Sequence, residues 1–212
     1  HELIQQGGLA REPVDAARIN AIEPTLQGDF YGGFFTPSDS TGDIHKFSRG
    51  LAAAASKLGG VFRHETEVDA LRHTGNGVEI DSRVTNSTLA SEPSGMTERF
   101  DGVVVCAGVR SRAFAAQLGD RVNIYPVKGY SVSVNLPDQH SQESAPWMSL
   151  LDDDAKIVTS RLGAGRFRIA GTAEFNGYSK DIRNDRIEPL VSWCRQHFPG
   201  VDTEHVIPWA GL

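Results

Sequence analysis

Residues 100–108 read Phe-Asp-Gly-Val-Val-Val-Cys-Ala-Gly, and this run does most to decide the predicted fold. An unbroken run of β-branched residues that ends in small ones is typical of a strand buried on both faces, as in a parallel sheet. Within such a strand, Cys106 is expected to pack as a small apolar side chain. A short helix is predicted next, over residues 111–118. This part of the chain therefore indicates a strand followed by a helix.

Two helices are predicted before this strand. Residues 44–58 carry an apolar stripe at helical spacing, with Asp43 as the expected N-cap and Gly59-Gly60 at the end. Residues 12–22 form the other predicted helix, because Glu12-Pro13 is a common helix start.

The segment between residues 61 and 98 is predicted to hold strands and a loop. Strand-like pieces lie at 61–63, 68–72 and 78–83, and the turn Gly75-Asn76-Gly77 makes the last two a hairpin. Residues 85–98 are rich in Ser, Thr, Glu, Pro and Gly, so we expect a solvated loop there.

The last third of the chain has the alternation of antiparallel strands. A long strand is predicted over 124–136, and a second hairpin joins 156–162 to 166–172 through Gly163-Ala164-Gly165. An amphipathic helix is predicted over 181–198. One parallel-type strand followed by antiparallel strands indicates an α+β (mixed α/β) chain with pieces of two domains.

Composition narrows the class of protein. The chain has 212 residues and a formal net charge of -6, without a basic run, which argues against nucleic acid as a partner. No stretch approaches the roughly 20 apolar residues of a membrane span. Two cysteines are too few for a disulfide framework and favour a reducing compartment. The histidines and cysteines have no metal-ligand spacing, so no metal site is predicted.

Several phrases, in order along the chain, resemble the FAD-dependent oxidoreductases of the D-amino-acid oxidase superfamily. Within it they are most similar to the D-amino-acid dehydrogenase type (small, catalytic subunit). The most specific are Tyr125-Pro126-Val127-Lys128-Gly129-Tyr130-Ser131 and Gly171-Thr172-Ala173-Glu174. The others include Gly33-Phe34-Phe35-Thr36-Pro37, Thr66-Glu67-Val68, Thr159-Ser160-Arg161-Leu162-Gly163 and Trp209-Ala210-Gly211-Leu212.

This resemblance implies an enzyme that oxidises D-amino acids by hydride transfer to FAD, after which water releases a 2-oxo acid and ammonia. It implies that residues 40–122 form part of an FAD-binding domain. Residues 1–39 with 123–212 would then form an antiparallel-sheet substrate-binding domain. The implied partners are a small amino-acid substrate and a quinone as electron acceptor. The implied location is cytoplasmic, with peripheral attachment to the inner membrane face as a variant.

The sequence also departs from the family pattern. The Gly-x-Gly-x-x-Gly turn that holds the FAD pyrophosphate at a helix N-terminus is absent, and the chain stops at Leu212, before a further Arg-Pro phrase of the family. We therefore expect an internal fragment that is inactive alone and does not retain FAD. The candidates for binding the substrate carboxylate therefore include residues beyond Leu212.

The resemblance also assigns candidate site residues. Val68, Ala107 and Gly108 are candidates for cofactor binding. For Val68 the resemblance alone implies a backbone contact with the adenine ring, whereas Ala107 and Gly108 are small residues after a strand, which let a cofactor approach the backbone. Substrate-binding candidates are Lys128, Tyr130, Arg161, Thr172 and Glu174. Arg161 is preferred to Arg166 and Arg168 as a carboxylate partner, although arginines on alternating strands are commonly just the exposed face. No residue is assigned a catalytic role with certainty.

Two other functions stay open at this point. A glycine or sarcosine oxidase of the same superfamily would share the scaffold and differ in its pocket residues and acceptor. A flavin-free binding module would share the substrate domain alone, and the presence or absence of the glycine fingerprint in the complete reading frame separates it from the enzyme.

Overall fold

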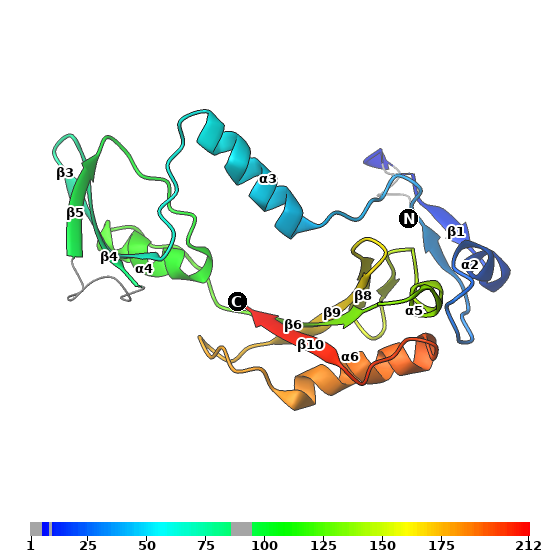
Figure 1. The fold of residues 1–212 in the computed structure, drawn as a ribbon. Helices are drawn as coiled ribbons and strands as arrows, with labels where there is room; N and C mark the ends of the chain where they lie inside the picture. The colour runs from blue at the N-terminus through cyan, green and yellow to red at the C-terminus, as the bar shows by residue number, and fades with distance from the viewer. Residues whose placement is uncertain (1–5, 9, 86–94) are drawn as a thin grey trace. The chain divides into compact units, whose positions relative to one another are not determined.

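The computed structural model describes residues 6–8, 10–85 and 95–212 of the chain. The chain divides into two compact units. Unit 1 comprises residues 1–47 and 127–211, and unit 2 comprises residues 48–126 with Leu212. Helices and antiparallel sheets occur together (Figure 1), which confirms the predicted mixed α+β class.

Unit 1 is built on a five-stranded antiparallel sheet in the order β10-β6-β9-β8-β7. Its strands are β6 (Lys128–Asn135), β7 (Leu151–Asp152), β8 (Ile157–Arg161), β9 (Arg166–Glu174) and β10 (Val206–Gly211). Helix α6 (Asn184–His197) runs along one face of this sheet (Figure 1). The predicted strand, the β8–β9 hairpin and the helix are confirmed, whereas β10 was not predicted.

The core of unit 1 follows from alternation along the strands. Every second residue of β6, β8 and β9 points to the face that α6 covers, and the others point to the opposite face, which we call the second face. Phe167 of β9 meets Phe198 edge to face, with ring centroids 5.9 Å apart. The buried cluster also includes Val132, Val134, Ile169, Leu190 and Cys194.

A β-bulge interrupts the pairing of β6 with β9. Tyr130 lies opposite Gly171, but the next pair is Gly129 with Ala173, so Thr172 is the extra residue. Thr172 has a φ of 58°, a left-handed conformation that glycine usually takes in such bulges. The bulge brings Glu174 opposite Lys128, on the face covered by α6.

Smaller elements complete unit 1. Strand β1 (Glu12–Val14) pairs with β2 (Gly33–Phe35), and helix α2 (Ala16–Ile22) begins after Asp15, whose carboxylate accepts from Arg18 N at 2.8 Å. The predicted helix start at Glu12-Pro13 was wrong, because the N-cap lies two residues beyond the proline and the preceding residues pair with β2. Helix α5 (Gln139–Ser144), capped by Asp138, was not predicted.

Helix α3 (Ile44–Lys57) begins in unit 1 and continues in unit 2, as the apolar stripe predicted. Asp43 Oδ1 accepts from the N–H groups of His45 at 3.0 Å and Lys46 at 3.2 Å. These backbone hydrogen bonds, led by the one from Lys46, lower the pKa of the Asp43 carboxyl. Gly59, with a φ of 93°, follows the last turn.

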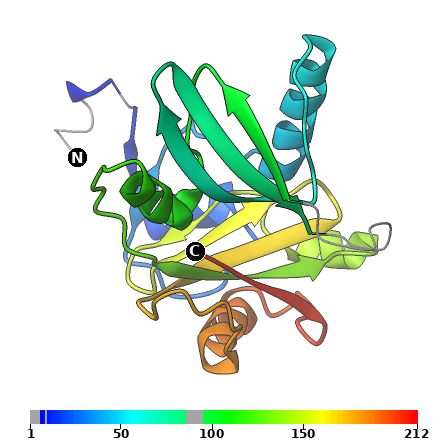
Figure 2. The ribbon, with the colours of Figure 1, turned by 90° about the vertical axis from the view of Figure 1, so that its left-hand side faces the viewer.

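Unit 2 contains a three-stranded antiparallel sheet with the order β3-β4-β5. The strands are β3 (Thr66–Thr74), β4 (Gly77–Val84) and β5 (Gly95–Phe100), and the predicted β3–β4 hairpin is confirmed. A 3-10 turn, η1 (Gly108–Arg110), leads into helix α4 (Ser111–Gln117), which lies against β3 (Figure 2). The side chain of Gln117 accepts from Leu71 N at 2.8 Å and fixes this packing.

Four predictions for unit 2 were wrong. Residues 61–63 and 103–107 form no strand, and Val61 and Val104 are 83% and 86% exposed. A strand needs a partner for its backbone, and no described strand lies beside either run. Cys106 is consequently exposed, not packed. Residues 95–98 belong to β5, where Thr97 donates to Asp81 at 2.7 Å, and 86–94 of the expected loop lie outside the described residues.

Candidate functional site

Three of the substrate-binding candidates meet at the bulged end of β6 and β9. The Lys128 ammonium lies 2.8 Å from Glu174 Oε2, and the Tyr130 hydroxyl donates to the same oxygen at 2.7 Å. Lys128 also donates to the carbonyl of Asp181 at 2.9 Å. All three side chains are buried, so this is an ionic cluster inside unit 1.

The second oxygen of Glu174 is also occupied. Arg183 Nη1 and Arg186 Nε donate to Oε1 at 3.1 and 3.3 Å. Hydrogen bonds from Lys128, and then from Tyr130, lower the pKa of the Glu174 carboxyl from 4.5 to about 2. The hydrogen bond to Glu174 likewise raises the pKa of Lys128. The cluster ties the sheet to the start of α6 and the segment before it, because Lys128 donates to the Asp181 carbonyl while Arg183 and Arg186 donate to Glu174.

Thr172 lies beside this cluster without joining it. It is half-buried at the bulge, and its left-handed backbone departs from what a β-branched residue normally adopts. Such a conformation costs of order 1–3 kcal/mol and persists only where the surroundings enforce it. The ladder on both sides of Thr172 provides that constraint.

Arg161, the preferred carboxylate partner, is buried; within the described residues its hydrogen bonds go to backbone carbonyls, and its guanidinium lies 4.5 Å from the centroid of the Trp147 ring. Nε donates to Gly163 O at 2.9 Å and Nη1 to Ala145 O at 3.0 Å. Nη2 donates to Gln142 O at 3.1 Å and to Ala164 O at 2.8 Å. Burial lowers the pKa of Arg161. These contacts hold the end of α5 against the β8–β9 turn and leave Arg161 little capacity for a ligand.

The other two arginines of the sheet project from its second face. Arg166 Nη2 forms an ion pair with Asp43 Oδ2 at 2.8 Å. Arg168 Nη2 donates to the Ser131 hydroxyl at 3.0 Å, and its guanidinium lies 5.3 Å from the centroid of the Trp209 ring. All three arginines lie on the alternating strands β8 and β9, but only Arg161 is buried.

In unit 2 the cofactor-binding candidates lie on two elements that an ion pair connects. Glu67, next to Val68 on β3, accepts from Arg110 at 2.8 Å and from Arg83 at 2.6 Å. The hydrogen bond from Arg110 leads the effects that lower the pKa of Glu67. Arg110 ends the 3-10 turn that begins at Gly108, so Glu67 links β3 to that turn.

The backbone at Gly108 fits the close approach of a flat group such as a flavin or adenine ring. Gly108 has a φ of 54°, and no atom lies within 4 Å of the place that a Cβ would take. The N–H of Ala107 is satisfied by Ser111 Oγ at 3.1 Å, which fixes the turn. Val68 is half-buried at an irregularity in the β3–β4 register.

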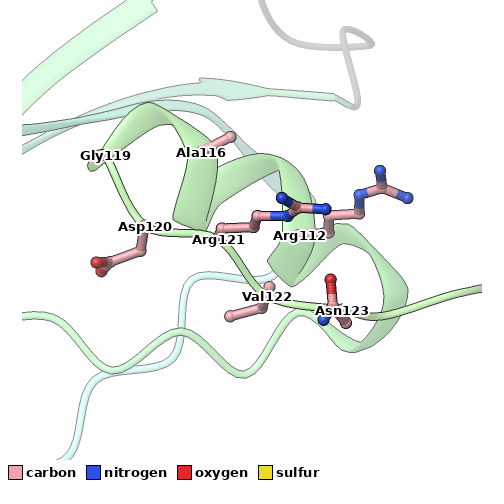
Figure 3. A pocket seen from close by; sticks show the side chains of 7 residues that line it. All are labelled: Arg112, Ala116, Gly119, Asp120, Arg121, Val122 and Asn123. Carbon is pink, nitrogen blue, oxygen red and sulfur yellow. The ribbon is translucent and has the colours of Figure 1, made fainter.

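A hollow of about 320 Å³ lies at the end of α4, also in unit 2 (Figure 3). The residues that line it are Arg112, Ala116, Gly119, Asp120, Arg121, Val122 and Asn123. No sequence pattern singled out these residues, because two arginines near a glycine are common and only the fold brings them to one hollow. The hollow is open, and Asp120 offsets part of its positive charge.

Neither a metal site nor a membrane span emerges from the described part of the chain. Its His, Cys, Asp and Glu side chains form no group of three or more that could hold a metal ion. No helix among residues 6–8, 10–85 and 95–212 has the length and apolar character needed to cross a membrane.

Several solved structures share this architecture. A glycine oxidase from Geobacillus kaustophilus superposes with a TM-score of 0.81 over 98% of this chain and 52% of its own, at 20% identity. An L-proline dehydrogenase from P. horikoshii gives a TM-score of 0.78 over 99% of this chain and 54% of its own, at 15% identity. At these identities the likeness concerns the fold alone.

The chain belongs to the DAO family, described as FAD dependent oxidoreductase, whose model matches residues 1–212. It is 53% identical over its whole length to D-amino acid dehydrogenase 3 of Mesorhizobium japonicum, covering 50% of that protein. It is 41% identical to D-amino acid dehydrogenase of Paramagnetospirillum magneticum, covering 100% of this chain and 48% of that protein. The chain thus spans about half the length of these curated relatives, and the predicted family is confirmed.

Proposed function

We propose that the full-length protein is an FAD-dependent dehydrogenase that oxidises D-amino acids to 2-oxo acids and ammonia, in amino-acid catabolism. The observation that carries this proposal is the 53% identity, over all 212 residues, to a relative named D-amino acid dehydrogenase 3. The membership in the DAO family supports FAD as the cofactor.

Each unit contributes differently to this function. Unit 2 forms part of the FAD-binding domain, with Val68, Ala107 and Gly108 against the cofactor, and unit 1 forms the substrate-binding domain. FAD, when bound, supplies the acceptor for the two electrons that leave the amino acid. The residues of this chain bind and orient. Lys128, Tyr130 and Glu174 act as positioning residues, because their bonds to one another hold the bulged strand ends that border the substrate.

We also propose that the electrons pass on to a quinone, since the relatives are named dehydrogenases, not oxidases. A quinone acceptor would place the protein in the cytoplasm at the inner face of the membrane. Oxygen uptake without an added acceptor would contradict this part of the proposal.

A glycine or sarcosine oxidase activity has less support. The glycine oxidases among the solved structures share the fold at 20% identity, which does not extend to their substrate. The family description as FAD dependent argues against a flavin-free binding module.

The test is an anaerobic visible spectrum of the full-length gene product before and after addition of D-alanine, with L-alanine as the matched control. Bleaching of the flavin absorbance by the D-enantiomer alone is expected. A flavin that only glycine or sarcosine bleaches would transfer the protein to the oxidase group, and a protein without flavin would overturn the enzyme proposal.

The 212-residue chain alone is expected to bind FAD weakly or not at all, because no phosphate-binding Gly-x-Gly-x-x-Gly turn occurs in it. Gel filtration of the chain with excess FAD should separate the two. A yellow, stoichiometric complex of the chain alone would contradict this expectation.

A further inference from the structure

The second face of the five-stranded sheet presents one group that the ionic cluster and the proposed cofactor contacts leave unused, the Arg168 guanidinium. Arg168 lies on β9, its hydrogen-bond partner Ser131 on β6, and Trp209 on β10. Three neighbouring strands therefore fix one side chain: β9 supplies it, the Ser131 hydroxyl binds Nη2 at 3.0 Å, and the Trp209 ring lies 5.3 Å away.

This guanidinium has more unused donors than Arg161 and, unlike Arg166, faces no carboxylate among the described residues. Arg161 fills its donors with four carbonyls, and Arg166 is paired with Asp43. Within the described residues, Arg168 makes no ion pair with a carboxylate, and its single hydrogen bond is the one to the Ser131 hydroxyl. A guanidinium has five N–H donors, so most of those of Arg168 stay available to a ligand.

The surroundings favour an anion with an apolar neighbour. Ser131 is buried, whereas the Trp209 side chain is half exposed. The guanidinium therefore contacts a buried hydroxyl on β6 and an accessible aromatic ring on β10. A partly desolvated guanidinium attracts a carboxylate more strongly than one in bulk water does, and its planar fork matches the two oxygens. The fixed rotamer reduces the entropy that binding would cost.

We propose that Arg168 binds a carboxylate of the amino-acid substrate, with Ser131 and Trp209 as positioning residues. This assignment rests on the proposed function. The carboxylate is either the α-carboxylate, common to all amino acids, or that of an acidic side chain, and the same arginine chemistry would serve both.

The test uses the full-length gene product and three variants. Arg168→Met removes the charge and keeps the length of the side chain, and Arg168→Lys keeps the charge without the fork. Arg18→Met is the matched control, because Arg18 is an exposed residue of α2 and not of the five-stranded sheet. Calorimetry measures the binding of propionate, which lacks an amine to oxidise, and of propionamide, which lacks the charge. Unfolding curves confirm that each variant is folded.

If Arg168 binds the α-carboxylate, Arg168→Met weakens propionate binding about tenfold or more, with propionamide unchanged, and raises the KM of D-alanine and D-glutamine alike. If it binds a side-chain carboxylate, propionate and D-alanine are unaffected, and the preference for D-glutamate over D-glutamine is lost. Arg168→Lys should fall between Arg168→Met and the wild type in whichever of these quantities changes.

The inference is overturned if folded Arg168→Met binds propionate and turns over D-alanine, D-glutamate and D-glutamine as the wild type does. A wild-type protein that oxidises none of these amino acids would instead refute the proposed function. Propionate binding would still decide the role of Arg168 in that case, and its absence from the wild type would overturn the inference as well.

Discussion

Unit 1 and unit 2 differ in how they treat their apolar side chains. Unit 1 gathers them in a single cluster between the five-stranded sheet and α6. In unit 2, Leu71, Val78 and Phe114 are buried, while Leu58, Val61 and Val104 are 83–90% exposed. Burial of apolar area is the dominant stabilising effect in folding, so unit 1 holds its own core and unit 2 holds much less of one.

This difference is consistent with the length of the chain, which covers about half of each of its curated relatives. A protein of about twice this length has further sequence with which to cover the apolar residues of unit 2. Unit 1 needs no such cover for its core, and it is therefore the part whose stability the chain alone should report.

The largest effect is expected from Phe167→Ala. Phe167 is fully buried in the cluster of unit 1, and truncation of such a side chain removes about 3–5 kcal/mol from the free energy of unfolding, because the cavity relaxes only in part. Urea unfolding of the 212-residue chain measures this. Phe100→Ala in unit 2 is the matched control, where the exposed ring should contribute little. Equal losses at both positions would remove the distinction between the units.

A smaller loss is expected from Glu174→Gln, because the amide oxygen still accepts hydrogen bonds while the charge that balances Lys128 disappears. The control is Glu98→Gln on β5, whose exposed pair with Arg63 should hardly affect the urea midpoint. Loss of stability in the control alone would place the important ion pair in unit 2.

The same carboxyl predicts a dependence on pH. The pKa of Glu174 is about 2 in the folded chain against 4.5 ordinarily, so its contribution is fully present above pH 4.5 and is lost as the pH falls from there towards 2. Acid unfolding, followed by circular dichroism, should begin at a higher pH in the Glu174→Gln variant than in the wild-type chain. An unchanged acid transition would show that the cluster contributes nothing.

A gain is expected from Thr172→Gly. Glycine takes a φ of 58° without steric cost, so the variant should be more stable by about 1 kcal/mol. Thr66→Gly, at a residue of β3 without a positive φ, should instead lose 0.5–1 kcal/mol. Destabilisation of both variants to the same extent would mean that the Thr172 side chain contributes more than its backbone costs.

The smallest effect is expected from Val104→Ser. Val104 is 86% exposed in the chain, and surface substitutions usually change stability by less than about 0.5 kcal/mol. A loss of more than about 1 kcal/mol in urea unfolding would show that residues 103–107 pack within this chain.

The sequence predicted the parts of the fold that depend on local pattern. The stripe of α3, the β3–β4 hairpin and the β8–β9 hairpin follow from spacing and turn residues alone. Residues 103–107 have the composition of a buried strand, yet composition does not provide the neighbouring strand that pairing requires. Strand β10 was missed because Pro208 and Trp209 do not show a clear alternation.

The candidate site was predictable as a set of residues but not as an arrangement. Arg161 and Arg168 both occur on alternating strands, and only the fold shows that Arg161 is enclosed by carbonyls from the end of α5 and from the β8–β9 turn, whereas Arg168 is not. Helix α5 was not predicted from the sequence, so the carbonyls of Gln142 and Ala145 at its end could not enter the prediction. Lys128 and Glu174 lie 46 positions apart in the chain, and their pairing depends on the register.

The bulge at Thr172 acts as a change of phase in β9. Odd-numbered residues from Phe167 to Gly171 point into the core, whereas beyond Thr172 it is the even-numbered Glu174 that does so. A relative that lacks one residue at this point would keep every side chain on its present face and merely straighten the strand. Straightening without shortening would instead carry Glu174 through to the side of Arg168 and leave the Lys128 ammonium buried alone. A one-residue gap in an alignment here is therefore compatible with an unchanged set of core residues, and a relative of equal length keeps those residues in place only if it keeps the bulge.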